Sequence, residues 1–398
     1  ASAVLVEGNM LFNNDTTNTF FDSTIGVSAD VSPGLIQGNN NALLFTIAST
    51  VTVDDGDIRF TDSTLFETTQ TDIIVNSGNV EFLDDSNFEL RFSSSVTINL
   101  GNFDMRNNAE FIAVRGDLDI LGGNLRAFDD TFVDISFSDI NIAGNVEFAN
   151  RVNVNMLQNE MNVVGGTFST ADSVELRSQR LDLLVDGDMI FNGIYHDFLT
   201  SDIEVKSGVL QSNLNSEVVA IQTPITVTGG NMEFNDASTL YAEDVPVIIN
   251  NGNVIFADNS VIDFALSTSL TINNGNFDIL NNAKLTSGPA TSIIDINGGN
   301  FRVFDDVALD LITIDMFVGG NVQFTDQSEL SLTDSEVDVV GGTFSTADTV
   351  NLSFDTSSLL VEGDVLFDGT SHLFEDSTIK VNAENGNFGV LQVNANAL

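Results

Sequence analysis

The sequence predicts an all-β fold, a parallel β-helix (β-solenoid) with about 22 residues and three short strands in each coil. Three observations support this prediction. A glycine recurs at a nearly constant interval, apolar side chains alternate with a period of two, and no segment has the periodicity and capping signals of a helix. At about 22 residues per coil, the 398 residues make about 18 coils.

The recurring glycine is usually followed by Asn or Asp and marks one corner of each coil. Gly56, Gly78, Gly101, Gly123 and Gly144 are separated by 22, 23, 22 and 21 residues. Asn and Asp tolerate tight turns, and stacked amides can hydrogen-bond to one another along a pile of strands. We interpret this corner as structural and not as a phosphate-binding loop, because neither a Lys nor a helix follows the glycine.

A longer repeat is superimposed on the coil. The decapeptide VVGGTFSTAD occupies residues 163–172 and again 339–348, and the displacement, 339 − 163 = 176, equals eight coils of 22 residues. The sequence therefore predicts a single continuous solenoid over residues 1–398. Its eight-coil blocks lie at roughly 8–186 and 187–362, with a partial third block at 363–398.

Apolar residues alternate with polar ones inside each coil, as expected for strands with one buried face. In the coil that begins at Gly78, the alternation includes Val80, Phe82, Phe88, Leu90, Phe92, Val96, Ile98 and Leu100. In the coil that begins at Gly252 it includes Val254, Phe256, Ile262, Phe264, Leu266, Leu270 and Ile272. Phe82 and Phe256 are predicted to point inward. A leucine-rich repeat also has asparagines at this interval, but the 31 phenylalanines disfavour it.

Composition limits the partners. Twelve basic residues against 58 acidic ones give a net charge of −46, so the chain should repel nucleic acids and anionic lipid surfaces. We expect no nucleic-acid partner and no membrane-spanning segment, because no apolar run approaches the roughly 20 residues of a bilayer span. The absence of Cys fits either a reducing compartment or an extracellular protein without disulfides.

The GGNVxF-like turn and strand, the abundance of Asn, Asp, Ser and Thr, the absence of Cys and the scarcity of Lys form a recognisable pattern. It resembles the parallel β-helix repeat regions of large bacterial surface and secreted proteins, such as autotransporter passengers and filamentous-haemagglutinin-type adhesins. The resemblance covers the whole chain. It implies a right-handed coil, a shaft or adhesin, and an extracellular or cell-surface location.

A second corner of the coil is acidic. It includes the carboxylate pairs Asp84 with Asp85, Asp129 with Asp130 and Asp305 with Asp306. Stacked carboxylates repel one another, and hard cations such as Ca²⁺ take several oxygen ligands. These six residues are therefore weak candidate cation ligands. The calcium-binding nonapeptide is absent, and a solvated acidic face is the favoured interpretation. We expect no other cofactor.

No catalytic constellation is evident. His196 and His372 are 372 − 196 = 176 residues apart, so they occupy the same position in successive blocks, and we expect both to be polar surface residues. Some parallel β-helices cleave acidic polysaccharides with clustered carboxylates and basic residues, but the basic residues here are scattered. We therefore expect no enzyme activity, with a polysaccharide-degrading enzyme as the distant alternative.

The two ends of the chain are complementary in phase and predict self-association. Residues 1–7 supply the last strand of a coil and residues 389–398 supply its beginning. We expect a structural protein whose subunits stack head to tail into a homopolymeric extracellular fibre. The predicted interface comprises Val4, Val6, Met10, Phe12, Phe388, Val390, Leu391, Val393 and Leu398. The alternative is an adhesin stalk excerpted from a giant tandem-repeat protein; the sequence does not identify a glycan or cell-surface receptor.

Overall fold

The computed structural model describes residues 2–28, 33–347, 349–382 and 389–393. These residues form a parallel β-solenoid of about 17 turns of about 22 residues, with two parallel sheets and no helix. The predicted fold class is confirmed. The chain divides into two compact units, Ala1–Asp197 and Phe198–Leu398, which are described separately below. The predicted eight-coil blocks stay a prediction.

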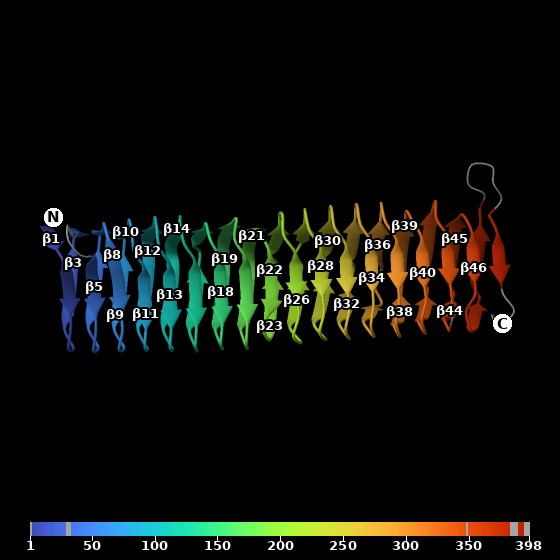
Figure 1. Ribbon diagram of the computed structural model, residues 1–398, viewed down its shortest axis with the longest axis horizontal. Helices are drawn as coiled ribbons and strands as arrows, with labels where there is room; N and C mark the ends of the chain where they lie inside the picture. Colours follow the sequence, from blue (N-terminus) through green and yellow to red (C-terminus); the bar gives the residue numbers. More distant parts are fainter. Residues whose placement is uncertain (1, 29–32, 348, 383–388, 394–398) are drawn as a thin grey trace. The chain divides into compact units, whose positions relative to one another are not determined.

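Each turn contributes a strand to three rows. The first row follows the glycine corner, the second follows the acidic corner, and the third follows a further bend that begins with a single left-handed residue in most turns. In each unit, a strand pairs in parallel with the equivalent strand of the next turn (Figure 1). For example, Val80 and Phe82 of β11 pair with Phe103 and Met105 of β13.

The strands of the first unit are as follows. Its first row comprises β2 (Asn9–Phe12), β5 (Gly34–Gly38), β8 (Gly56–Phe60), β11 (Val80–Leu83), β13 (Phe103–Arg106), β15 (Leu125–Phe128), β18 (Val146–Ala149), β20 (Phe168–Ala171) and β22 (Met189–Asn192). Its second row comprises β3 (Thr17–Phe21), β6 (Leu43–Ile47), β9 (Leu65–Thr69) and β16 (Phe132–Ser136), and its third comprises β1 (Ser2–Glu7), β4 (Ser23–Ser28), β7 (Thr50–Val53), β10 (Asp72–Val75) and β17 (Asp139–Ile142). Strands β12 (Asn87–Ile98), β14 (Glu110–Ile120), β19 (Asn153–Val164) and β21 (Glu175–Asp186) continue through both rows, and β23 (Tyr195–Leu199) contains the unit boundary.

The strands of the second unit repeat this arrangement. Its first row comprises β25 (Leu210–Ser212), β28 (Met232–Phe234), β31 (Val254–Phe256), β34 (Phe277–Ile279), β37 (Phe301–Val303), β40 (Val322–Phe324), β43 (Phe344–Thr346), β46 (Val365–Phe367) and β49 (Leu391–Val393). Its second row comprises β26 (Glu217–Ile221), β29 (Thr239–Glu243), β32 (Val261–Ala265), β35 (Lys284–Ser287), β38 (Ala308–Ile312), β41 (Glu329–Thr333), β44 (Asn351–Asp355) and β47 (Ser371–Glu375). Its third row comprises β24 (Asp202–Val205), β27 (Ile225–Val227), β30 (Pro246–Ile249), β33 (Ser269–Ile272), β36 (Ser292–Ile296), β39 (Ile314–Val318), β42 (Glu336–Val340), β45 (Ser358–Glu362) and β48 (Thr378–Val381).

The core consists of ladders of identical or similar side chains from successive turns. Phe82 and Phe256 are buried, as predicted. The Phe82 ring stacks on Phe60 of the preceding turn, with centroids 5.4 Å apart, and Phe256 stacks on Phe234 at 4.9 Å. Offset stacking of this kind adds to the apolar burial that stabilises the turns.

Three residues of the predicted alternation point outward instead. Phe92, Leu100 and Leu266 are exposed, and Phe92 and Leu266 have φ angles of 45° and 48°. At Phe92 and Leu266 a left-handed residue interrupts the alternation of the strand, because it turns the side chain out at a corner. Leu100 immediately precedes the corner glycine Gly101. The prediction that these three side chains continue the inward-facing alternation is wrong.

Candidate functional site

The glycine corner is determined by close approach between turns. A Cβ atom at Gly101 would collide with the carbonyl oxygen of Gly78, and one at Gly275 would collide with that of Gly252. Gly101 and Gly275 also have positive φ angles of 141° and 153°. Backbone therefore packs directly on backbone at this corner.

The asparagine after each corner glycine forms a hydrogen-bonded ladder. Asn102 Oδ1 accepts the backbone N–H of Asn124 at 3.1 Å, and Asn276 Oδ1 accepts that of Asn300 at 3.0 Å. The Nδ2 groups of Asn124 and Asn300 donate to the same oxygens at 2.9 and 3.0 Å. These amides satisfy corner N–H groups that the strands leave unpaired, so their role is structural.

Sequence reasoning missed a ladder of buried hydroxyl groups. Ser335 Oγ donates to the carbonyl of Thr333 at 2.8 Å and accepts the N–H of Ile314, in the preceding turn, at 3.1 Å. Ser138 makes the equivalent bonds to Ser136 at 3.0 Å and from Gly116 at 3.1 Å. The signal in the sequence is a Ser or Thr at one position of most coils. The other members that make both bonds are Ser49, Thr223, Ser357 and Ser377. Thr71 and Ser201 make the donated bond, and Ser94 accepts the N–H of Thr71.

The acidic corner is a tight turn with two consecutive left-handed residues. Asp84 and Asp85 have φ angles of 52° and 60°, Asp129 and Asp130 have 58° and 64°, and Asp305 and Asp306 both have 60°. Asn, Asp and Gly adopt positive φ angles more readily than other residues do. Turn geometry therefore explains the residue types at this corner.

Most of these candidate carboxylates have partners in the adjacent turn. Asn107 Nδ2 donates to Asp84 at 2.9 Å, and Asn108 Nδ2 donates to Asp85 at 3.1 Å. Asn150 Nδ2 donates to Asp129 at 3.1 Å.

Asp130 is held by Arg151, whose Nε and Nη2 lie 2.6 Å from its two carboxylate oxygens. This hydrogen-bonded guanidinium lowers the pKa of Asp130. Asp305 and Asp306 take part in the backbone ladder through Asn282 and Asp326. Among the described residues, no group of three or more His, Cys, Asp or Glu side chains is arranged to hold a metal ion. Cation binding at the six candidate residues stays a prediction.

The two histidines are not surface residues as expected. His196 is fully buried, its Nε2 lies 2.7 Å from Thr170 Oγ1, and its ring lies 4.6 Å from that of Phe191. His196 is in phase with buried Phe198 on β23, so strand alternation directs it inward. His372 is half-buried, and burial lowers its pKa.

One ion pair recurs in both units. Arg126 Nε and Nη2 both lie 2.6 Å from the carboxylate of Asp104, and Arg302 makes the same bidentate contact with Asp278 at 2.6 and 2.5 Å. The arginines belong to the repeated RAFDD and RVFDD segments. Each pair bridges adjacent turns on the outer surface of the first row.

The predicted interface residues lie in the outermost described turns. Val4, Val6 and Met10 are half-exposed, whereas Ile25 and Val27, which pair with Val4 and Val6, are buried. Phe12 is buried.

At the other end of the described residues, Val390, Leu391 and Val393 are about half-exposed. Leu391 and Val393 pair with buried Val365 and Phe367. Phe388 and Leu398 lie outside the described residues.

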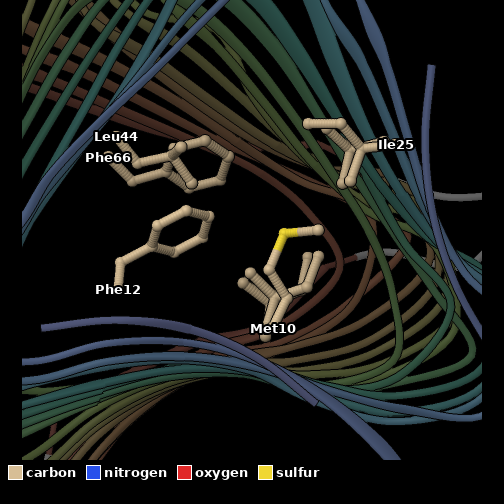
Figure 2. Close-up of a pocket in the computed structure, with 8 residues that line it drawn as sticks. Met10, Phe12, Ile25, Leu44 and Phe66 are labelled. Carbon is tan, nitrogen blue, oxygen red and sulfur yellow. The ribbon is translucent and has the colours of Figure 1, made fainter. Parts of the chain in front are cut away.

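A small apolar cavity lies inside the first turns. Figure 2 shows Met10, Phe12, Ile25, Leu44 and Phe66 around it, and its volume is about 10 Å³. This is about the size of one water molecule, and an apolar lining offers no hydrogen bonds to hold one. The cavity is a packing defect and not a ligand site.

Comparisons of the chain with protein-family models, curated proteins and solved structures found no match. In the part of the chain that the structure describes, no helix is long and apolar enough to cross a membrane.

Proposed function

We propose that this chain is a structural protein, the shaft of an extracellular or cell-surface fibre. The observation that carries the proposal is the uniformity of the turns in each unit. The glycine, amide, hydroxyl and phenylalanine ladders use the same positions turn after turn. Such ladders stabilise a long object, whereas an enzyme needs one place where the repeat is broken to bring reactive groups together.

We further propose that the fibre grows by head-to-tail stacking of its subunits. Inward-facing Val4 and Val6 at one side, and Leu391 and Val393 at the other, are more exposed than their partners one turn further in. An additional turn would bury these side chains and pair the free strand edges. A second copy supplies that turn in a homopolymer, and the continuing chain supplies it in a tandem-repeat adhesin stalk.

The resemblance to autotransporter passengers and filamentous-haemagglutinin-type adhesins supports the extracellular location. The acidic charge and the absence of cysteine are compatible with it. We propose no catalytic role. Incubation of the protein with acidic and neutral polysaccharides tests this point, and steady release of oligosaccharides would contradict it.

Electron microscopy and sedimentation of the full chain test stacking. Two single variants, Val6→Pro and Val393→Pro, are compared with the unchanged chain. Each should abolish end-to-end association, because proline removes a strand donor. Leu5→Ser is the matched control, since Leu5 lies beside Val6 but points outward. Fibres that persist in the proline variants would refute stacking. A chain that stays monomeric at high concentration would leave the tandem-repeat stalk as the explanation.

A further inference from the structure

An unusual row of side chains follows one corner of the first unit. Phe92, Arg115, Phe137 and Arg180 occupy the bend between the second and third rows, and we refer to them as the aromatic ridge. Their φ angles are 45°, 55°, 56° and 56°, and the Phe92 and Phe137 side chains are 50% and 46% exposed. The left-handed conformation is common to this bend, since Gln70, Thr200 and Leu266 adopt it in other turns. The first unit is distinctive because it places two half-exposed aromatic rings and two exposed arginines there.

The arginines of the aromatic ridge also lack acidic partners. In the described part of the chain, neither Arg115 nor Arg180 forms an ion pair, although acidic residues outnumber basic ones by 58 to 12. Arg115 instead lies over the Phe137 ring, with its guanidinium carbon 5.8 Å from the centroid. Arginines of the same unit that do hold a carboxylate are Arg59, Arg91, Arg126, Arg151 and Arg177.

An acidic row lies beside the aromatic ridge. It comprises Asp117, Asp139, Glu160 and Asp182, each two residues after the left-handed residue at the bend of its turn. In the turn of Glu160 that bend residue is Gln158, which interrupts the aromatic ridge. Asp139 N–H donates to Asp117 Oδ1 at 3.2 Å, so neighbouring members are close together. Burial, together with Asp117 and Glu160, raises the pKa of Asp139. The row therefore carries crowded negative charge that an external cation would stabilise.

We propose that the aromatic ridge and the acidic row form a self-complementary surface through which two copies of this chain associate side by side. The two rows repeat once per turn, about every 4.8 Å, so they stay in register over several turns. A twofold axis parallel to the stacking direction places the ridge of each copy over the acidic row of the other. Arg115 and Arg180 then meet carboxylates, and Phe92 and Phe137 lose contact with water.

Sedimentation velocity of the full chain, over a concentration series at about 0.15 M salt, tests this lateral pairing. A Val6→Pro chain, in which end-to-end stacking is blocked, should still dimerise, because the ridge lies far from β1 in the sequence. The double variants below are therefore tested in this background. The double variants Arg115→Gln with Arg180→Gln, and Phe92→Asn with Phe137→Asn, should each weaken dimerisation by about tenfold or more. Arg151→Gln, at another corner, is the control and should have no effect on dimerisation.

Thermal melting separates an interface role from a structural one. Asn is better suited than Phe to left-handed backbone. At a protein concentration too low for dimerisation, the Phe92→Asn, Phe137→Asn variant should therefore melt at the same temperature as the unchanged chain or higher. A clear fall in its melting temperature would mean that the rings stabilise the monomer, and it would overturn the proposal.

Disulfide trapping identifies the contact independently of end-to-end stacking. The chain contains no Cys, so a mixture of an Arg115→Cys chain with an Asp117→Cys chain should form an intermolecular disulfide. A monomer at every concentration, a dimer indifferent to both double variants, or a dimer that forms no disulfide would each overturn lateral pairing.

Discussion

Arg126 and Asp104 form a bidentate ion pair between neighbouring turns, with both N···O distances at 2.6 Å, and the Asp104 side chain is only 8% exposed. Arg126→Gln should therefore lower the free energy of unfolding by about 1–3 kcal/mol, because it leaves a largely buried carboxylate with poorer hydrogen bonds. Urea denaturation measures the change. Arg151→Gln removes an exposed pair and should cause no measurable loss. Equal losses in both variants would contradict this explanation.

The glycine corner should tolerate no side chain. In Gly275→Ala the new Cβ collides with the backbone carbonyl of Gly252, so we expect a loss of at least about 3 kcal/mol in thermal or urea unfolding. Gly288→Ala is the matched control in the same unit. The nearest atom to a Cβ there is 3.7 Å away, and the change should be within about 1 kcal/mol. A tolerated alanine at Gly275 would show that the turns can separate easily.

Removal of a hydroxyl group from the ladder should destabilise the fold, and a substitution that keeps the hydroxyl should restore stability. Ser335→Ala leaves the Ile314 N–H without its acceptor and should cost about 1–3 kcal/mol of stability. Ser335→Thr should restore most of it, because Thr71 and Thr223 occupy the equivalent position in other turns. Ser260 is the control, since its buried hydroxyl has no hydrogen-bond partner among the described residues and alanine there should be nearly neutral. A threonine as damaging as alanine would exclude the hydroxyl as the cause.

The acidic row should make stability depend on pH. Burial raises the pKa of Asp139, with further increases from Asp117 and Glu160. The folded state therefore binds this proton more tightly than the unfolded chain. The stabilisation is complete below the unfolded pKa of about 3.9 and is lost as the pH rises through the raised folded value.

The measurement is the melting temperature of Asp139→Asn and of the unchanged chain from about pH 3.5, below the unfolded pKa, to about pH 8. The variant should be more stable at neutral pH, and its advantage should shrink as the pH falls. His372 has a lowered pKa and therefore destabilises the fold as the pH falls. This contribution is the same in the variant and in the unchanged chain, so it does not affect the difference between their melting temperatures. If the stability advantage of Asp139→Asn increased as the pH fell, the raised pKa of Asp139 would be contradicted.

Much of the fold is predictable because a solenoid repeats a local pattern. The alternation identified Phe82 and Phe256 as core residues, and both are buried. The same alternation indicates that His196 points inward, because it is in phase with buried Phe198. The prediction that His196 lies on the surface followed the polarity of histidine instead of this pattern.

The sequence alone determined the all-β solenoid, its 22-residue period and most of its inward-facing residues, because strand alternation and tight-turn residues are local properties. Only the tertiary structure shows which residues of successive turns contact one another at the corners. Gly101 meets Gly78, Asn124 meets Asn102, and Ser335 meets Ile314, each about one period away in sequence. The left-handed backbone at Phe92 also directs that side chain outward. Period and composition do not encode the sign of φ or the distance between turns, which depend on how one turn packs on the next.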